Sequence, residues 1–247
     1  REALLGVSIT GWMNNPKVLF DEKVLEKGAK IVKEVNREVA AIIGINPAAR
    51  TTCVKPSGNA SVLLQTASGI HAEHSPMYIR NIQMNKESEI TQAIIKSNPY
   101  MVEESVWSAS GTDVVVSFPI IPHKGSMMKD ELLGVTHLDK VKLAQKHWVV
   151  AGTNEELCAD KGIRHNVSNT ILVDDWAAVE QYVFKNRHSF SGISFLSLSG
   201  DKDYNQAPNT AVINAKQMVK EYDEAAIFAS GLVVDALKAY PNLWDAC

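Results

Sequence analysis

The sequence has few cysteines and no long apolar run, and each shortage excludes a class of protein. Three cysteines occur among 247 residues, at Cys53, Cys158 and Cys247. So few thiols, unevenly spaced, are typical of a reducing compartment rather than of a disulfide-stabilised secreted protein. No apolar segment approaches the ~18 residues that a membrane span needs, and no signal peptide opens the chain. We therefore expect a cytoplasmic protein with no membrane partner.

The sequence also lacks an excess of positive charge. Lysine and arginine number 25 against 28 acidic residues, which gives a formal net charge of −3. We therefore expect no direct binding to nucleic acid. Internal repeats and low-complexity tracts are absent as well. The 45% of hydrophobic residues indicates a globular domain with a sizeable core, and Arg1 in place of methionine suggests a fragment, a processed chain or half of a split protein.

What the sequence does contain is an alternation of strand and helix signals. Residues 4–10 predict a buried strand or the end of one, and residues 48–54 predict a second strand. Asp21 caps a predicted helix between them. Its apolar positions recur at helical spacing: Val24, Gly28, Val32, Val35, Val39, Ile42 and Ile43. Further on, residues 138–151 and 176–186 predict helices and 192–198 a buried strand. This alternation is typical of α/β architecture.

One segment departs from that alternation. Residues 102–106 and 113–121 flank Ser108-Ala109-Ser110-Gly111, which predicts a β-hairpin with a four-residue connection. We expect it to be an insertion at about residues 100–135 within a single catalytic-domain fragment that covers residues 1–247.

The most informative stretch is the turn that follows the strand at 48–54 and precedes an apolar segment able to start a helix. Such a junction leaves backbone N–H groups unpaired, and together with the helix dipole they attract an anion. Gly58 allows close approach of a ligand, while Ser57, Asn59 and Ser61 add side-chain donors. The spacing matches neither a Walker motif nor a dinucleotide fingerprint. An ordinary turn with a capped helix remains the alternative.

Other reactive side chains give weaker patterns. His71 and His74 are spaced as metal ligands can be, but glycine and proline around them indicate a loop, which favours local hydrogen bonds over metal binding. Cys53 is better explained as a buried structural thiol than as a reactive one, and Cys247 could belong to a mobile thiol tail. The polar loop at 203–208 could line a ligand site or be a solvated turn. These patterns assign no catalytic residue and no metal site.

A shared pattern occurs at residues 1–11, 52–61, 68–71 with 78–81, 165–170, and 194–196 with 204–208. Taken together, these stretches resemble one family, the adenosylcobalamin-dependent (class II) ribonucleotide reductases. The resemblance implies an oxidoreductase that converts ribonucleotides to deoxyribonucleotides by radical chemistry. It also implies that one turn holds the substrate phosphates, here Pro56, Ser57, Gly58, Asn59, Ala60 and Ser61. Asn59 stands where the family more often has threonine, which leaves the backbone donors in place.

The resemblance covers only the C-terminal half of the family's catalytic domain, a ten-stranded α/β barrel. It implies that this chain forms the second half of that barrel, with flanking helices, and is inactive without a complementary N-terminal half. That half would carry the radical cysteine in an Asn-x-Cys-x-Glu finger loop and share the adenosylcobalamin site. A thioredoxin-like reductant is a further implied partner, with Cys247 as a possible thiol relay. A non-catalytic nucleotide- or phosphate-binding module, or a reductase of a non-cobalamin class, remain alternatives.

Overall fold

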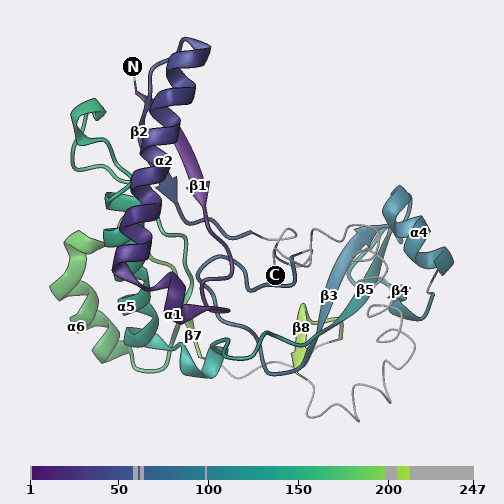
Figure 1. Cartoon of the computed structure of the whole chain (residues 1–247). Coiled ribbons are helices and arrows are strands. Elements are labelled where there is room, and N and C mark those ends of the chain that lie inside the picture. Colours follow the sequence, from purple (N-terminus) through teal and green to yellow (C-terminus); the bar gives the residue numbers. More distant parts are fainter. Residues whose placement is uncertain (1, 58–60, 62–63, 98, 199–204, 212–247) are drawn as a thin grey trace. The chain divides into compact units, whose positions relative to one another are not determined.

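The computed structural model describes residues 2–57, 61, 64–97, 99–198 and 205–211 (Figure 1). The chain divides into two compact units, each built from two stretches of sequence. The first unit comprises Arg1–Glu73 and Pro122–Gly200, and the second comprises His74–Ile121 and Asp201–Cys247. Within the described residues, every helix is too short or too polar to cross a membrane.

Parallel strands form the centre of the first unit. Its described strands are β1 (Ala3–Ser8), β2 (Ala48–Cys53), β6 (Ile171–Val173) and β7 (Phe195–Ser197). β1 pairs with β2 and β6 pairs with β7, both in parallel. A parallel bridge between Val54 and Val167 connects the two pairs. The α/β architecture predicted for this part of the chain is therefore confirmed.

Two helices of the first unit begin where the sequence predicts. The described helical segments are α1 (Pro16–Leu19), α2 (Glu22–Ile43), η2 (Lys129–Glu131), α5 (Gly134–Ala144), η3 (Gln145–Val150), η4 (Glu155–Leu157), α6 (Trp176–Asn186) and η5 (Arg187–Ser189). The Asp21 carboxylate accepts the N–H of Val24 at the start of α2, and Asp175 caps α6 in the same way. The helix predicted at 138–151 starts four residues earlier than expected, at Gly134. It continues from α5 into the π-helix η3, which ends at Val150.

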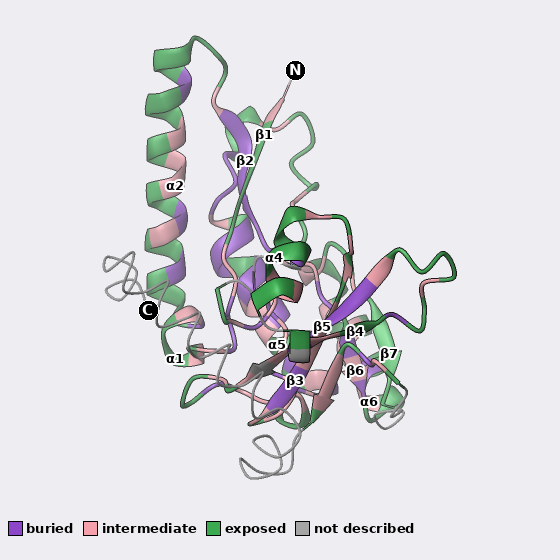
Figure 2. Ribbon diagram, turned by 90° about the vertical axis from the view of Figure 1, so that its right-hand side faces the viewer, coloured by how far each residue is buried: buried purple, intermediate pink, exposed green. Residues whose placement is uncertain are grey.

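The face of α2 that packs against the core overlaps only in part with the predicted one. Of the predicted positions, Gly28 adjoins the buried Trp148 ring and Val32 packs against the core. Leu25, Ala29 and Ala40 are buried, whereas the predicted inward positions Val24, Val35, Val39, Ile42 and Ile43 are exposed. Figure 2 shows the buried residues along one side of the helix. Small residues explain the choice of face, since a Cβ atom at Gly28 would lie only 3.2 Å from the Trp148 ring. The helix packs closely where its side chains are small. Val32 also packs against the core, and the other valines and isoleucines of the helix are exposed.

Strands β1 and β7 form as predicted, but the expectation that they are buried is wrong. Leu4 of β1 is 61% exposed and Leu196 of β7 is 55% exposed, while all six residues of β2 are buried. In the part of the chain that the structure describes, β1 pairs only with β2 and β7 only with β6. A parallel sheet normally has both faces covered, whereas these outer strands present apolar side chains that the described residues of this unit leave exposed.

The second unit contains an antiparallel sheet. Its described strands are β3 (Tyr78–Asn85), β4 (Val102–Glu104), β5 (Asp113–Ile120) and β8 (Asn209–Ala211), in the order β4-β5-β3-β8, with α4 (Glu89–Ser97) and η1 (Pro99–Met101). The predicted hairpin is confirmed as β4 and β5, but its connection is longer than four residues. The reason is that Val106 leaves β4 and donates its N–H to the side chain of Gln206. Residues from Pro122 onward belong to the first unit.

We expect Gly152→Ala to lower the free energy of unfolding by about 2 kcal/mol, as overpacking of a tight core does. A Cβ atom at Gly152 would lie 1.9 Å from the Thr52 hydroxyl oxygen, and that hydroxyl is fixed by a 2.6 Å hydrogen bond to the Trp148 carbonyl. Urea denaturation of the chain measures the change. Gly192→Ala serves as the control because its nearest contact would be 3.5 Å away. Equal stability of the two variants would contradict this account of the packing.

Candidate functional site

The turn predicted to bind phosphate follows β2 directly, at the carboxyl end of the parallel strands. Pro56, Ser57 and Ser61 belong to the described residues, and Gly58, Asn59 and Ala60 lie outside them. β1 ends beside the turn, since Ser8 pairs with Cys53 and the Ser8 hydroxyl accepts the N–H of Lys55 at 2.9 Å. Ligands of parallel α/β sheets bind at this end of the strands. The location therefore suits the predicted site.

Three hydroxyl groups from separate stretches meet at the entry to the turn. In this hydroxyl cluster (Thr10, Ser57 and Ser68), the oxygens of Thr10 and Ser57 lie 2.6 Å apart, and the N–H of Ser57 donates to the Ser68 hydroxyl at 3.2 Å. The Thr10 hydroxyl donates to the Ala67 carbonyl and accepts the N–H of Gly69. Ser57, predicted as a donor to the ligand, is thus also a residue that fixes the turn to its neighbours.

The loop that follows the turn packs closely against the start of the turn at Gly69. Gly69 has φ +52°, and a Cβ atom there would lie 2.7 Å from the Lys55 carbonyl oxygen. Only glycine combines that backbone conformation with such a contact. Sequence reasoning missed Thr10 and Ser68 as site residues, although both fall in stretches that carry the family resemblance.

The Asn14 side chain is hydrogen-bonded to the same loop. Its side-chain carbonyl accepts the Thr66 hydroxyl at 2.6 Å and the N–H of Ala67 at 2.7 Å. Its amide donates to Glu73 at 2.6 Å and to the Ser126 hydroxyl at 3.0 Å. One side chain therefore connects the segments after β1, after the turn and before α5. Such fixation keeps a binding site in one geometry before the ligand arrives.

Two histidines lie at this loop, His137 buried and His71 half-buried. The Nδ1 of His71 donates to the Ser68 carbonyl at 2.9 Å, and its Nε2 accepts the N–H of Thr170 at 3.0 Å. The predicted local hydrogen bonds of His71 are confirmed, and neither nitrogen is left to ligate a metal. Burial lowers the pKa of His71, and burial together with His71 lowers the pKa of His137 to about 4. Both imidazoles are therefore neutral at physiological pH.

The described cysteines are free thiols, one buried and one half-buried. Cys53 is buried at the end of β2, and burial raises the pKa of its thiol, as the sequence predicted for a core residue. The thiol of Cys158 lies 3.3 Å from the Asn154 carbonyl. Cys247 lies outside the described residues. Among the residues that the structure describes, no group of three or more histidine, cysteine or acidic side chains is placed to hold a metal ion.

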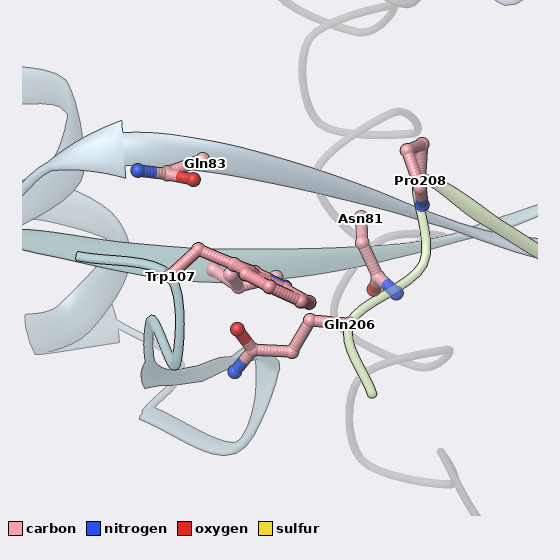
Figure 3. Close-up of a pocket in the computed structure, with 6 residues that line it drawn as sticks. Asn81, Gln83, Trp107, Gln206 and Pro208 are labelled. Carbon is pink, nitrogen blue, oxygen red and sulfur yellow. The ribbon is translucent and has the colours of Figure 1, made fainter. Parts of the chain in front are cut away.

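The second unit has a cavity of about 520 Å³, shown in Figure 3. Its walls are Asn81, Gln83, Trp107, Val115, Gln206 and Pro208. The amides among them are used within the protein. Gln206 accepts the N–H of Val106 at 2.9 Å and donates to the Glu104 carbonyl at 2.7 Å, and the Trp107 indole donates to the Asn205 carbonyl. The described part of the polar loop, residues 205–208, is therefore hydrogen-bonded to the hairpin.

Known proteins resemble the chain in sequence, although no family model matches it. A probable adenosylcobalamin-dependent ribonucleoside-triphosphate reductase of Dictyostelium discoideum is 30% identical over 121 residues, which are 49% of this chain and 16% of that protein. The adenosylcobalamin-dependent ribonucleoside-triphosphate reductases of Euglena gracilis and Levilactobacillus brevis are each 23% identical. They match 91% and 81% of this chain, and 29% and 26% of their own lengths. The chain spans less than a third of the length of these curated relatives.

The fold points the same way. A crystal structure of a B12-dependent (class II) ribonucleotide reductase superposes with a TM-score of 0.63 at 20% identity, over 82% of this chain and 26% of that one. At this identity the superposition establishes the fold alone. The family resemblance read from the sequence is thus confirmed: over most of its length, the chain is a homologue of one segment of the adenosylcobalamin-dependent ribonucleotide reductases and has the fold of the matching part of that crystal structure.

Proposed function

We propose that this chain is one segment of an adenosylcobalamin-dependent ribonucleotide reductase, to which it contributes half of the α/β barrel and the turn that binds the substrate phosphates. The observation that carries the proposal is the exposure of the outer parallel strands. Leu4 on β1 and Leu196 on β7 are more than half exposed, and parallel sheets are stable when both faces are covered. The remainder of a longer enzyme would supply the missing cover. Relatives that extend far beyond this chain are consistent with that reading.

The turn at Pro56–Ser61 would hold the phosphates of the ribonucleotide. Backbone N–H groups and neutral hydroxyls bind an oxyanion without adding a group that the radical chemistry can reduce. The phosphates are distant from the reacting ribose carbons, so their binding anchors the ribose where the radical acts. The hydroxyl cluster supports this role because it fixes Ser57 on both sides, through Thr10 and Ser68.

The thiol chemistry of the reductase would come from the rest of the enzyme. Replacement of a ribose hydroxyl by hydrogen through a radical requires a reactive cysteine and the exclusion of water. Cys53 is unsuited, because it is buried and burial raises the pKa of its thiol. We therefore propose as partners the complementary N-terminal part, which carries the radical cysteine, and a thioredoxin-like reductant. Cys247 remains the proposed thiol relay of this chain.

The cofactor implied by the names of the relatives would be bound mainly by that same remainder. Adenosylcobalamin supplies the radical when it is bound. The described residues at the carboxyl ends of β1 and β2 do not by themselves fit such a cofactor, since they present hydroxyls and N–H groups that suit a small oxyanion. His71, which could offer a nitrogen to cobalt, uses both nitrogens in hydrogen bonds to the main chain. The task of this chain is accordingly to bind and orient the substrate.

We expect the isolated chain to form no deoxyribonucleotide, and we expect turnover when it is combined with the polypeptide that supplies the preceding part of the reductase. Labelled ribonucleoside triphosphate, adenosylcobalamin and a dithiol reductant provide the assay, and gel filtration reports the complex. Turnover by the isolated chain, or neither complex nor turnover from the combination, would refute the proposal. Turnover that persists without adenosylcobalamin would instead indicate a non-cobalamin class.

In that combined enzyme, Ser57→Ala should raise KM for the ribonucleotide about tenfold and change kcat little. The substitution breaks the link to Thr10, so ordering the turn costs binding energy, about 1 kcal/mol for each side chain or loop group immobilised. Ser57→Thr retains the hydroxyl and should restore KM. Ser110→Ala, in the exposed hairpin connection of the second unit, is the matched control. A KM unchanged by Ser57→Ala would argue against a phosphate site at this turn.

A further inference from the structure

A cavity in the first unit gathers positive charge that nothing described so far uses. It measures about 500 Å³ and lies between the helix α5–η3 and the loops that precede β6 and β7. It is lined by Lys142, Gln145, Lys146, Val150, Gly162, Ile163, Arg164, His188, Ser189, Phe190 and Ser191. No carboxylate occurs among these lining residues, although the chain as a whole has a net charge of −3. The local charge of this cationic cavity is therefore positive, opposite in sign to the net charge of the chain.

Two of its cations have no carboxylate partner among the described residues. The ammonium of Lys142 donates to the Asn186 side-chain carbonyl at 2.8 Å, a neutral partner. Lys146 is exposed and forms no ion pair within the described part of the chain. Arg164 has a partner, Glu155 at 2.5 Å. Lys142 and Lys146 are four residues apart on one continuous helix, where like charges repel, so an anion bound between them would relieve that repulsion.

One wall of the cavity is formed by a π-helix, an element that is rare in proteins. Gln145, Lys146 and Val150 belong to the π-helix η3, and π-helical turns occur mostly as single turns, frequently at functional sites. Gln145 is 5% exposed, and its amide donates to the His165 carbonyl at 2.9 Å and to the Ser191 hydroxyl at 3.2 Å. A buried amide thus fixes both loops of the cavity to the helix, and the cavity is a defined part of the fold.

Apolar side chains complete the lining. Val150 and Ile163 are exposed, and the half-buried Phe190 lies beside the hydroxyl-bearing Ser189 and Ser191. An inorganic anion would use the cations alone. A ligand that joins a phosphate to a flat or apolar group would use the cations, the hydroxyls and the apolar surface together.

We propose that the cationic cavity binds a small organic phosphate, with Lys142 and Lys146 on the phosphate and Phe190 against the apolar part. This site is distinct from the turn at Pro56–Ser61, since its loops lead into β6 and β7 whereas that turn follows β2. The inference concerns the chain itself and does not depend on the reductase assignment.

Calorimetric titration of the full chain with ATP, pyrophosphate and adenosine tests the proposal. We expect ATP to bind more tightly than pyrophosphate, adenosine to bind weakest, and ATP affinity to fall as salt is added. The double substitution Lys142→Met with Lys146→Met should raise the Kd for ATP at least about tenfold, because charge-assisted contacts are lost. Lys23→Met with Lys27→Met removes the same charge from the exposed face of α2 and should leave the Kd unchanged.

Hydrogen exchange on the unaltered chain locates the ligand without relying on any variant. ATP should protect residues 160–164 and 187–191. Protection confined to residues 55–69 would place the nucleotide at the strand ends and overturn the proposal. Equal binding of ATP and pyrophosphate, equal Kd values for the two lysine double variants, or no heat of binding up to millimolar ATP would overturn it as well.

Discussion

The contact between β2 and the π-helix η3 holds the first unit together. The Trp148 indole donates to the Cys53 carbonyl at 3.0 Å, while the hydroxyls of Thr51 and Thr52 donate to the carbonyls of Gly152 and Trp148. All of these groups are buried, so breaking one bond would leave its partner unsatisfied at a cost of ~1–3 kcal/mol. The buried threonines of β2 are tolerated because carbonyl groups at the end of the helix and just after it accept their hydroxyl hydrogens.

Both proposed sites adjoin that contact. β2 leads into the turn at Pro56–Ser61, and η3 presents Gln145 and Lys146 to the cationic cavity. A ligand that displaced η3 would also disturb β2, because Trp148 and Thr52 are hydrogen-bonded across the contact. Any such coupling would act equally in both directions. The two sites are therefore connected through one buried contact, although they use different loops.

Features set by neighbouring residues could be predicted from the sequence, and those set by distant packing could not. The starts of α2 and α6 follow from Asp21 and Asp175, whose carboxylates reach N–H groups three residues on. The buried face of α2 was predicted only in part: Gly28 and Val32 adjoin the core as expected, but the burial of Leu25 and Ala29 depends on core residues far along the chain, such as Trp148.

In the candidate site too, features set by neighbouring residues could be predicted and features set by distant contacts could not. The turn after β2 was recognisable from local residue types, as was its location at a strand end. The partner of Ser57 was not, because Thr10 is 47 residues away and a lone threonine gives no local signal. The π-helical turn also escaped prediction, since its residues look like those of any amphipathic helix. Such long-range hydroxyl contacts are decided only when the strands align.

The uncovered side of β1 has a consequence for how the protein is made and handled. Within the described residues, its outer backbone groups pair with no strand, and Leu4, Leu5 and Val7 lie beside them in the open. An open apolar edge accepts whichever extended segment arrives first. After synthesis, the proposed remainder of the enzyme and another copy of the same chain would therefore compete for this edge, and the outcome would depend on their concentrations. Overproduction of the chain by itself would favour inclusion bodies.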